Sequence, residues 1–101
     1  MARIKTKTIH WNPSPDSDVA GYNVYVLFGE TAQPYEGTVI NVSGTEVKVP
    51  DDFPEGTFDQ EGKYVIQVSA VDDMGNESDT IQTVAEFDFV PPLPPSGLEV
   101  L

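Results

Sequence analysis

The chain of 101 residues contains no cysteine and a single histidine. Without cysteine, neither a disulfide framework nor a thiolate metal site can form, so the hydrophobic core must hold the fold unaided. A nucleophilic triad needs a base beside its nucleophile, and the sequence fixes no serine near the histidine, His10. These absences argue against an enzyme, and no cofactor is expected.

Basic residues and long apolar runs are also scarce. Five Lys and Arg stand against seventeen Asp and Glu, which gives a net charge of −12 at pH 7. This charge repels phosphate backbones and anionic lipid headgroups, so neither nucleic acid nor a membrane is an expected partner. No apolar run approaches the roughly 20 residues of a membrane span, and the opening MARIKTKTIHW has no apolar stretch of signal-peptide length.

Short alternating runs of apolar residues are what the chain does contain. The composition, 39% hydrophobic and 22% charged, suits a globular chain, and the length suits one domain. Val, Ile, Thr and Tyr recur in short runs between clusters of Pro, Gly, Asn and Asp, and helical periodicity is absent. The sequence therefore predicts an all-β fold of antiparallel strands. The predicted strands are Ile4–Trp11, Tyr22–Phe28, Thr38–Val42, Glu46–Val49, Lys63–Asp72 and Thr80–Phe87.

Alternation along the two most apolar strands predicts which side chains face the core. The inward residues are Tyr22, Val24, Val26, Phe28, Tyr64, Ile66, Val68 and Ala70. The outward residues are Asn23, Tyr25, Leu27, Val65, Gln67, Ser69 and Val71. Among these, Tyr25, Leu27, Val65 and Val71 are candidates for a small exposed apolar stripe.

Four segments give the chain a resemblance to the fibronectin type III domains. HWNPSPDSDVAGYNVYV resembles the family's W…P…GY-x-V pattern, with Trp11 at the end of a strand. FDQEGKYVIQVSAVD is similar to the family's L-x-P-x-x-x-Y-x-V-x-V-x-A-V-D stretch, with Phe58 at the Leu position and Tyr64 as the corner tyrosine. DMGNES resembles the bacterial form of the loop between the last two strands, and VPPLPPSGLEVL resembles a linker followed by the first strand of another domain.

This resemblance implies an immunoglobulin-like antiparallel β-sandwich of fibronectin type III topology over residues 1–89. Residues 90–101 would be a Pro-rich linker and the start, or first strand, of a following module. The chain departs from the family in the longer connection at residues 50–57 and in an apparently missing first strand before Ile4. The expected core residues are Trp11, Tyr22, Val24, Val26, Phe58, Tyr64, Ile66, Val68 and Ala70.

The two large aromatics Trp11 and Tyr64 are accordingly interpreted as core anchors rather than as ligand-stacking residues. The Tyr64 ring is expected to be buried, with its hydroxyl bonded to the backbone of the preceding turn.

An acidic pole is a further candidate site. In the family, the loops at residues 12–20 and 72–79 emerge at the same pole, which implies a cluster of oxygen ligands there. The weak calcium candidates are Asp16, Asp18, Asp72, Asp73, Asn76, Glu77 and Asp79. Calcium prefers several oxygen ligands, but these residues lack the regular spacing of an EF-hand. A solvated acidic pole and a calcium site both remain open.

The resemblance further implies a non-catalytic spacer or interaction module of a larger extracellular or cell-surface protein, with the neighbouring domains of the parent chain as its partners. The alternative is a binding module for a protein or a carbohydrate, which would use the acidic pole, with or without calcium, or a sheet face. PPLPP favours a stiff spacer of about 15 Å.

A missing first strand would leave unpaired backbone groups along the strand that contains Trp11. SGLEVL has the pattern of a first strand but lies at the other end of the chain. We therefore expect the possible strand donors Leu98 and Val100 either to lie in a disordered tail or to pair with the open edge of a second molecule.

Overall fold

The computed structural model describes residues 2–101 as an all-β fold, which confirms the all-β part of the predicted fold class. Its strands are β1 (Lys7–His10), β2 (Val19–Phe28), β3 (Thr38–Val42), β4 (Glu46–Val49), β5 (Gly62–Asp72) and β6 (Ile81–Phe87). The order agrees with the prediction, and β3 and β4 have the predicted bounds. β1 is shorter than predicted at both ends, and β2 begins earlier, at Val19. Within residues 2–101, no helix is long and apolar enough to cross a membrane.

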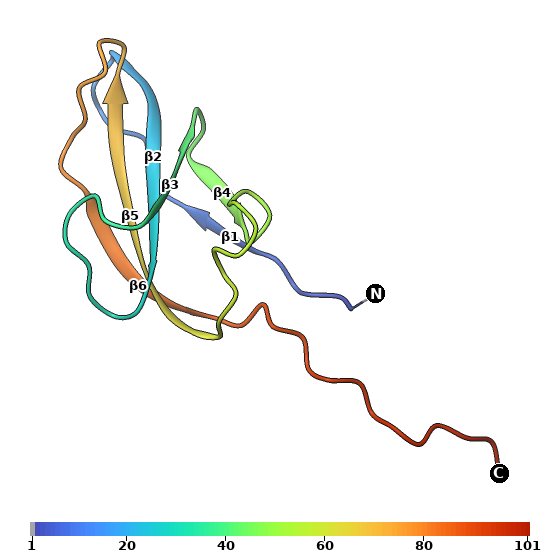
Figure 1. The fold of residues 1–101 in the computed structure, drawn as a ribbon. Helices are drawn as coiled ribbons and strands as arrows, with labels where there is room; N and C mark the ends of the chain where they lie inside the picture. The colour runs from blue at the N-terminus through green and yellow to red at the C-terminus, as the bar shows by residue number, and fades with distance from the viewer. Residues whose placement is uncertain (1) are drawn as a thin grey trace.

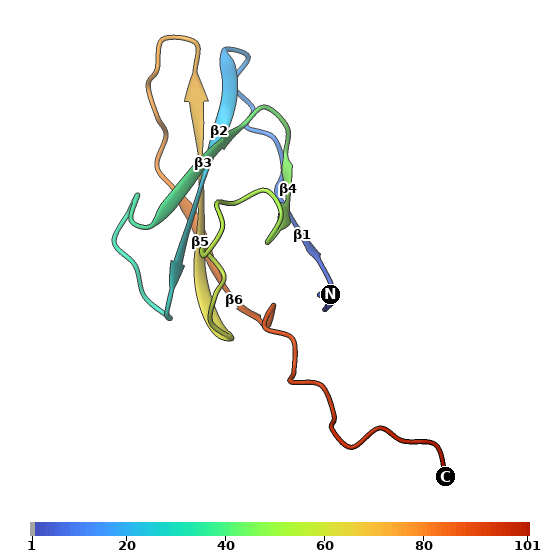
Figure 2. The same cartoon turned by 45° about the vertical axis from the view of Figure 1, so that its right-hand side comes forward.

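The strands form two antiparallel sheets. β1 pairs with β4, and the second sheet has the order β3-β2-β5-β6. Figures 1 and 2 show the β1–β4 pair to the right of the four-stranded sheet, on one side of it. The arrangement is consistent with a β-sandwich whose two layers contain two and four strands.

Aromatic rings fill much of the core between the sheets. Phe58 lies at the centre of this cluster, with ring centroids 5.0 Å from Tyr64, 5.6 Å from Phe87 and 5.4 Å from Phe89. Phe53 adds a fourth contact at 5.5 Å. It lies in the long connection at residues 50–57, so this departure from the family pattern contributes a ring to the core.

The residues expected in the core are located between the sheets. Ala70 is partly buried and packs against the cluster, and the others are buried: Trp11, Tyr22, Val24, Val26, Phe58, Tyr64, Ile66 and Val68. The core also contains residues that the sequence did not single out: Val47, Val49, Phe53, Phe87 and Phe89.

The predicted bond between Tyr64 and the preceding turn is present. The hydroxyl donates to the carbonyl oxygen of Gln60 at 2.5 Å, and the Gln60 N–H donates to the hydroxyl at 3.4 Å. Burial raises the pKa of Tyr64 above its usual 10.0. The side chain is therefore a protonated phenol, 0% exposed, that fixes the turn before β5.

Two predictions about side-chain exposure were wrong. Phe28, predicted to face the core, is 45% exposed at the end of β2, where its ring packs edge-on against Tyr64 at 5.1 Å. The exposed stripe on the outer face of the four-stranded sheet does not form, because Tyr25 is 7% and Val65 only 1% exposed. Residues 29–37 and 73–80 cover the middle of this face, whereas Val39 and Val84 on its two edge strands remain 48% and 44% exposed.

The last twelve residues, 90–101, leave the body of the molecule. Phe89 is the last buried residue, and none of residues 90–101 belongs to a strand. Leu98 and Val100, the possible strand donors, are 101% and 100% exposed. Figures 1 and 2 show this segment running away from both sheets as an extended tail.

Candidate interaction surfaces

One side of the sandwich is open between β1 and β6. A cavity of about 370 Å³ lies there, lined by residues of β1, β5 and β6 that include Ile9, Ile66 and Thr83. A second cavity of about 240 Å³ continues towards the loop at residues 12–15. Because both cavities are lined by Trp11, Asn12, Val68 and Ile81, we treat them as one surface and call it the β1–β6 groove.

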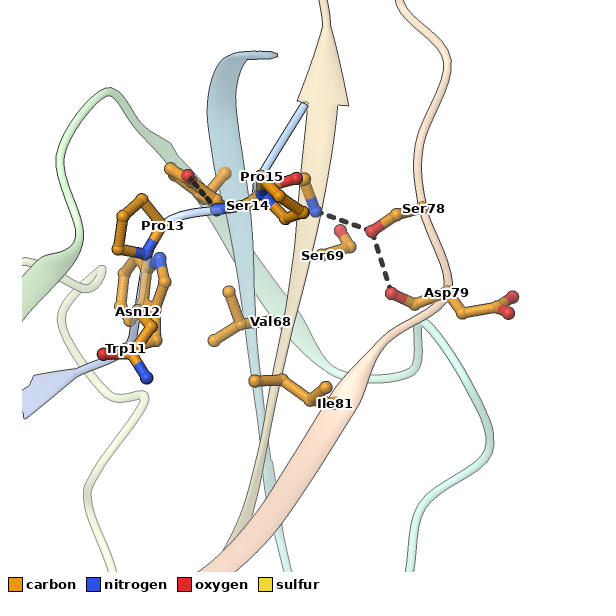
Figure 3. Close-up of a pocket in the computed structure, with 12 residues that line it drawn as sticks. Trp11, Asn12, Pro13, Ser14, Pro15, Val68, Ser69, Ser78, Asp79 and Ile81 are labelled. Carbon is orange, nitrogen blue, oxygen red and sulfur yellow. Dashed lines mark hydrogen bonds between the residues drawn. The ribbon is translucent and has the colours of Figure 1, made fainter. Parts of the chain in front are cut away.

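The groove exposes side chains that belong to the inner face. Ile81 lies on the same face of β6 as the core residue Phe87, since they are six positions apart, yet Ile81 is 67% exposed and Phe87 only 8%. Figure 3 shows Val68 and Ile81 extending from β5 and β6 towards the side of the cavity where Trp11 lies. The inner face of β6 is therefore covered at one end and uncovered at the other.

Trp11 forms the β1 side of the groove. Its ring meets Tyr22 edge-on at 5.6 Å, and the Tyr22 hydroxyl accepts a hydrogen bond of 2.9 Å from the Ser14 N–H, which holds the loop at residues 12–15. The buried Nε1 atom of Trp11 has no hydrogen-bond partner among the described residues.

The two edges of the β1–β4 sheet differ. The Trp11 N–H donates to the Thr45 carbonyl at 3.0 Å, so the alternate residues Lys7 and Ile9 also direct their backbone groups to β4. By the same alternation, Thr8 and His10 direct theirs away from β4 to the outer edge of β1.

On β4, one of the two outward residues, Lys48, is bonded within its own chain, whereas no such bond to the backbone of Glu46 exists among the described residues. The Lys48 N–H donates to Asp52 Oδ2 at 2.7 Å, and the Lys48 carbonyl accepts from the Asp52 N–H at 2.9 Å. No such bond to the backbone of Thr8 or His10 exists within residues 2–101. Within residues 2–101, the outer edge of β4 is therefore bonded at Lys48, whereas the outer edge of β1 is open at both of its outward residues.

The outer face of the four-stranded sheet carries a polar network that the sequence did not predict. Gln67 is 1% exposed; its Nε2 donates to the Gln33 carbonyl at 2.9 Å, and its Oε1 accepts from the Thr80 hydroxyl at 2.8 Å. Ser69 and Tyr25 both donate to Glu77 Oε2 at 2.5 Å. These six residues, the outer-face network, tie the two covering connections to the sheet.

The pKa values of Glu77 and Tyr25 are consistent with a structural role for the outer-face network. Burial alone would raise the pKa of Glu77, but hydrogen bonds from Ser69, Tyr25 and Asn23 outweigh it and lower that pKa below 4.5. Burial, together with the bond to Glu77 and its charge, raises the pKa of Tyr25 above 10.0. Glu77 therefore stays ionised and Tyr25 stays protonated near neutral pH.

Five of the seven calcium candidates gather at the predicted acidic pole. They line a shallow pocket of about 220 Å³: Asp16, Asp18, Asp72, Asn76 and Glu77. Asp73 and Asp79 do not line it, although the Asp73 N–H donates to the Asp18 carbonyl at 3.2 Å.

Two of these carboxylates already have donors within the chain. Asp72 accepts from the Asn76 side chain at 3.0 Å and from the backbone N–H groups of Asn76 and Met74 at 2.8 and 3.0 Å. These bonds lower the pKa of Asp72, and the bond from the Asn76 side chain has the largest effect. Glu77 serves the outer-face network. Among residues 2–101, no group of three or more His, Cys, Asp or Glu side chains is arranged to hold a metal ion.

Comparisons of the chain with protein-family models, with curated proteins and with solved structures gave no match in any of the three.

Proposed function

We propose that the chain is a fibronectin type III-like module that acts as a non-catalytic spacer or interaction module of a larger, extracellular protein. The sheet order β3-β2-β5-β6 opposite β1-β4 and the hydroxyl bond of Tyr64 support the resemblance. The extracellular location rests on the resemblance alone.

The junction at Phe89 is the observation that carries the spacer function. The Phe89 ring stacks on Phe87 at 5.4 Å, with an interplanar angle of 20°, and meets Phe58 edge-on. Immediately after this anchor the chain becomes exposed, and four prolines stand within residues 91–95. A segment that starts from a fixed point and is stiffened by proline holds the sandwich at a set distance from the residues that follow the segment.

The hydrogen bonding of Asp72 and Glu77 argues against a general-acid role for these two carboxylates. A general acid needs a raised pKa, whereas the pKa values of Asp72 and Glu77 are lowered by their hydrogen bonds. His10, the single histidine, lies exposed on β1.

The exposed aromatic side chains favour a spacer over a binding module that uses the sheet face. Phe28 lies on the inner side of β2, whereas Tyr35 packs against Tyr25 on the outer side at 5.9 Å. The two rings therefore do not converge on one surface. Binding through the acidic pole is the weaker alternative, because Asp72 and Glu77 are already engaged within the chain.

The spacer function is tested by measuring the length of the Pro-rich segment. Since the chain has no cysteine, Val90→Cys and Ser96→Cys would carry a short-range donor–acceptor pair for energy transfer at these two sites only. Polyproline geometry predicts a narrow distribution near about 19 Å, whereas a flexible coil of six residues predicts a broad one near about 12–15 Å.

Replacing the four prolines with serine should convert the first distribution into the second, and Leu93→Ser should leave it unchanged. A short, broad distribution in the protein with its prolines intact would contradict the spacer function.

A further inference from the structure

We propose that the β1–β6 groove binds residues 96–101 of a second copy of this chain as an added β-strand. This inference goes beyond the spacer function, because it assigns self-assembly to a surface and a segment that the spacer does not use.

The groove offers both requirements for an added strand. Along its β1 side, the backbone groups of Thr8 and His10 point outwards without partners in the described chain. Along its floor lie apolar side chains of the inner face, of which Ile81 is 67% exposed. A strand laid beside β1 would complete the hydrogen bonding of the edge and cover Ile81 at the same time.

The segment SGLEVL matches these requirements. Leu98 and Val100 share one face of an extended strand, about 6.6 Å apart, and both are fully exposed. Glu99 lies on the opposite face. The prolines up to Pro95 lack the N–H groups that pairing needs, so the part of the tail able to pair begins at Ser96.

The distribution of charge favours the same pairing. Each copy carries a net charge of −12, so association is opposed by repulsion over most of the surface. However, three of the five basic residues, Arg3, Lys5 and Lys7, lie exposed at the start of β1 and just before it. Glu99 of an incoming tail would therefore approach the least acidic edge of the molecule.

A second copy fits better than the tail of the same molecule. An antiparallel partner of β1 must enter the groove at the end where Trp11 lies. Val68 of β5 lines the groove at this end, and it is six residues, or about 20 Å, away from Gly62 at the start of β5. The tail leaves next to Gly62, the partner of Phe87. Residues 90–95 span about 20 Å when fully extended, so they could not also reverse direction. Figures 1 and 2 show the tail directed away from both sheets.

The test uses the full chain and two classes of variant. The wild type should show a weight-average mass in sedimentation equilibrium that rises with concentration from 11.0 kDa to at least twice that value. The donor variant Leu98→Asp/Val100→Asp and the acceptor variant Ile81→Asp should each remain monomeric. Leu93→Asp, an equally exposed position outside the pairing segment, should associate like the wild type.

Mixing the two defective variants gives the sharpest outcome. The donor variant keeps an intact groove and the acceptor variant keeps an intact tail, so together they should form a complex of one copy of each that grows no further. Trp11 is the single tryptophan and lines the groove. Its emission in the donor variant should shift when the acceptor variant carries Trp11→Phe and is added in excess.

Thr8→Pro, which removes an outward N–H at the open edge, provides a second acceptor variant if circular dichroism shows Ile81→Asp to be unfolded. The proposal is overturned if the wild type stays monomeric at all concentrations, if the donor variant associates like the wild type, or if the mixture forms no complex. Protection of residues 97–101 from hydrogen exchange in a monomer would assign the groove to the tail of the same molecule and would also overturn it.

Discussion

Replacing Gln67 with methionine should lower the free energy of unfolding by about 1–2 kcal/mol, because two hydrogen bonds are lost at a net value of about 1 kcal/mol each. Methionine keeps the unbranched shape, so little cavity forms at this 1% exposed position. The former partners, the Gln33 carbonyl and the Thr80 hydroxyl, belong to surface connections and can bind water instead. The melting temperature should therefore fall by roughly 5–15 °C.

A double-mutant cycle isolates the bond that matters. Gln67→Met, Thr80→Val and the double variant would be compared by urea unfolding, and we expect a coupling free energy of about 1 kcal/mol. Gln82→Met is the matched control, since Gln82 is the exposed cross-strand neighbour of Gln67 and should change stability by less than about 0.5 kcal/mol. Coupling below about 0.3 kcal/mol would refute the view that Gln67 clamps the connection at residues 73–80 to the sheet.

Three further predictions concern other parts of the fold. Tyr64→Phe should lower stability by about 1–2 kcal/mol, seen as a lower urea midpoint with an unchanged slope, because the Gln60 carbonyl loses its donor. Phe53→Ala should lower it by about 3–5 kcal/mol in the same assay, whereas Asp51→Ala should be neutral, since only Phe53 is buried. Glu77 has a lowered pKa in the folded state, so its contribution to stability is present above pH 4.5 and is lost as the pH falls further. The difference in the free energy of unfolding between the wild type and Glu77→Gln should therefore shrink as the pH falls below 4.5. A difference that stays constant over that range would contradict the role of the carboxylate.

The all-β class and the succession of strands along the chain could be predicted because alternation and turn residues are local signals. β3 and β4 were predicted to the residue, since both are short apolar alternations bounded by Gly37 and by the turn at Ser43 and Gly44. The start of β2 was missed, because Val19 and Ala20 follow a run of Asp and Ser that has the composition of a loop. Tyr64 was placed correctly from its parity and from the family resemblance together.

The burial of Gln67 and Ser69 on the outer face could not be predicted. Alternation says which residues share a face of β5, but it does not say whether that face meets water. Gln67 and Ser69 have the polar character of a solvent face, and the segments that bury them are irregular. Their contacts, such as that between Gln33 and Gln67, join residues far apart in the sequence. For the groove, the sequence predicted an open edge beside Trp11 but not the exposure of Ile81.

The unequal support of β1 and β5 implies that the molecule does not unfold evenly. β5 has eleven residues, is paired on both sides and is covered on both faces, so its amides should exchange with solvent only through global unfolding. β1 has four residues and, within the described part of the chain, pairs with β4 alone, so it should open at a small fraction of that free energy. Such an opening would separate Trp11 from Val68 while leaving the rings of Phe58, Phe87 and Phe89 packed. The width of the β1–β6 groove can therefore fluctuate without loosening the point from which the tail departs.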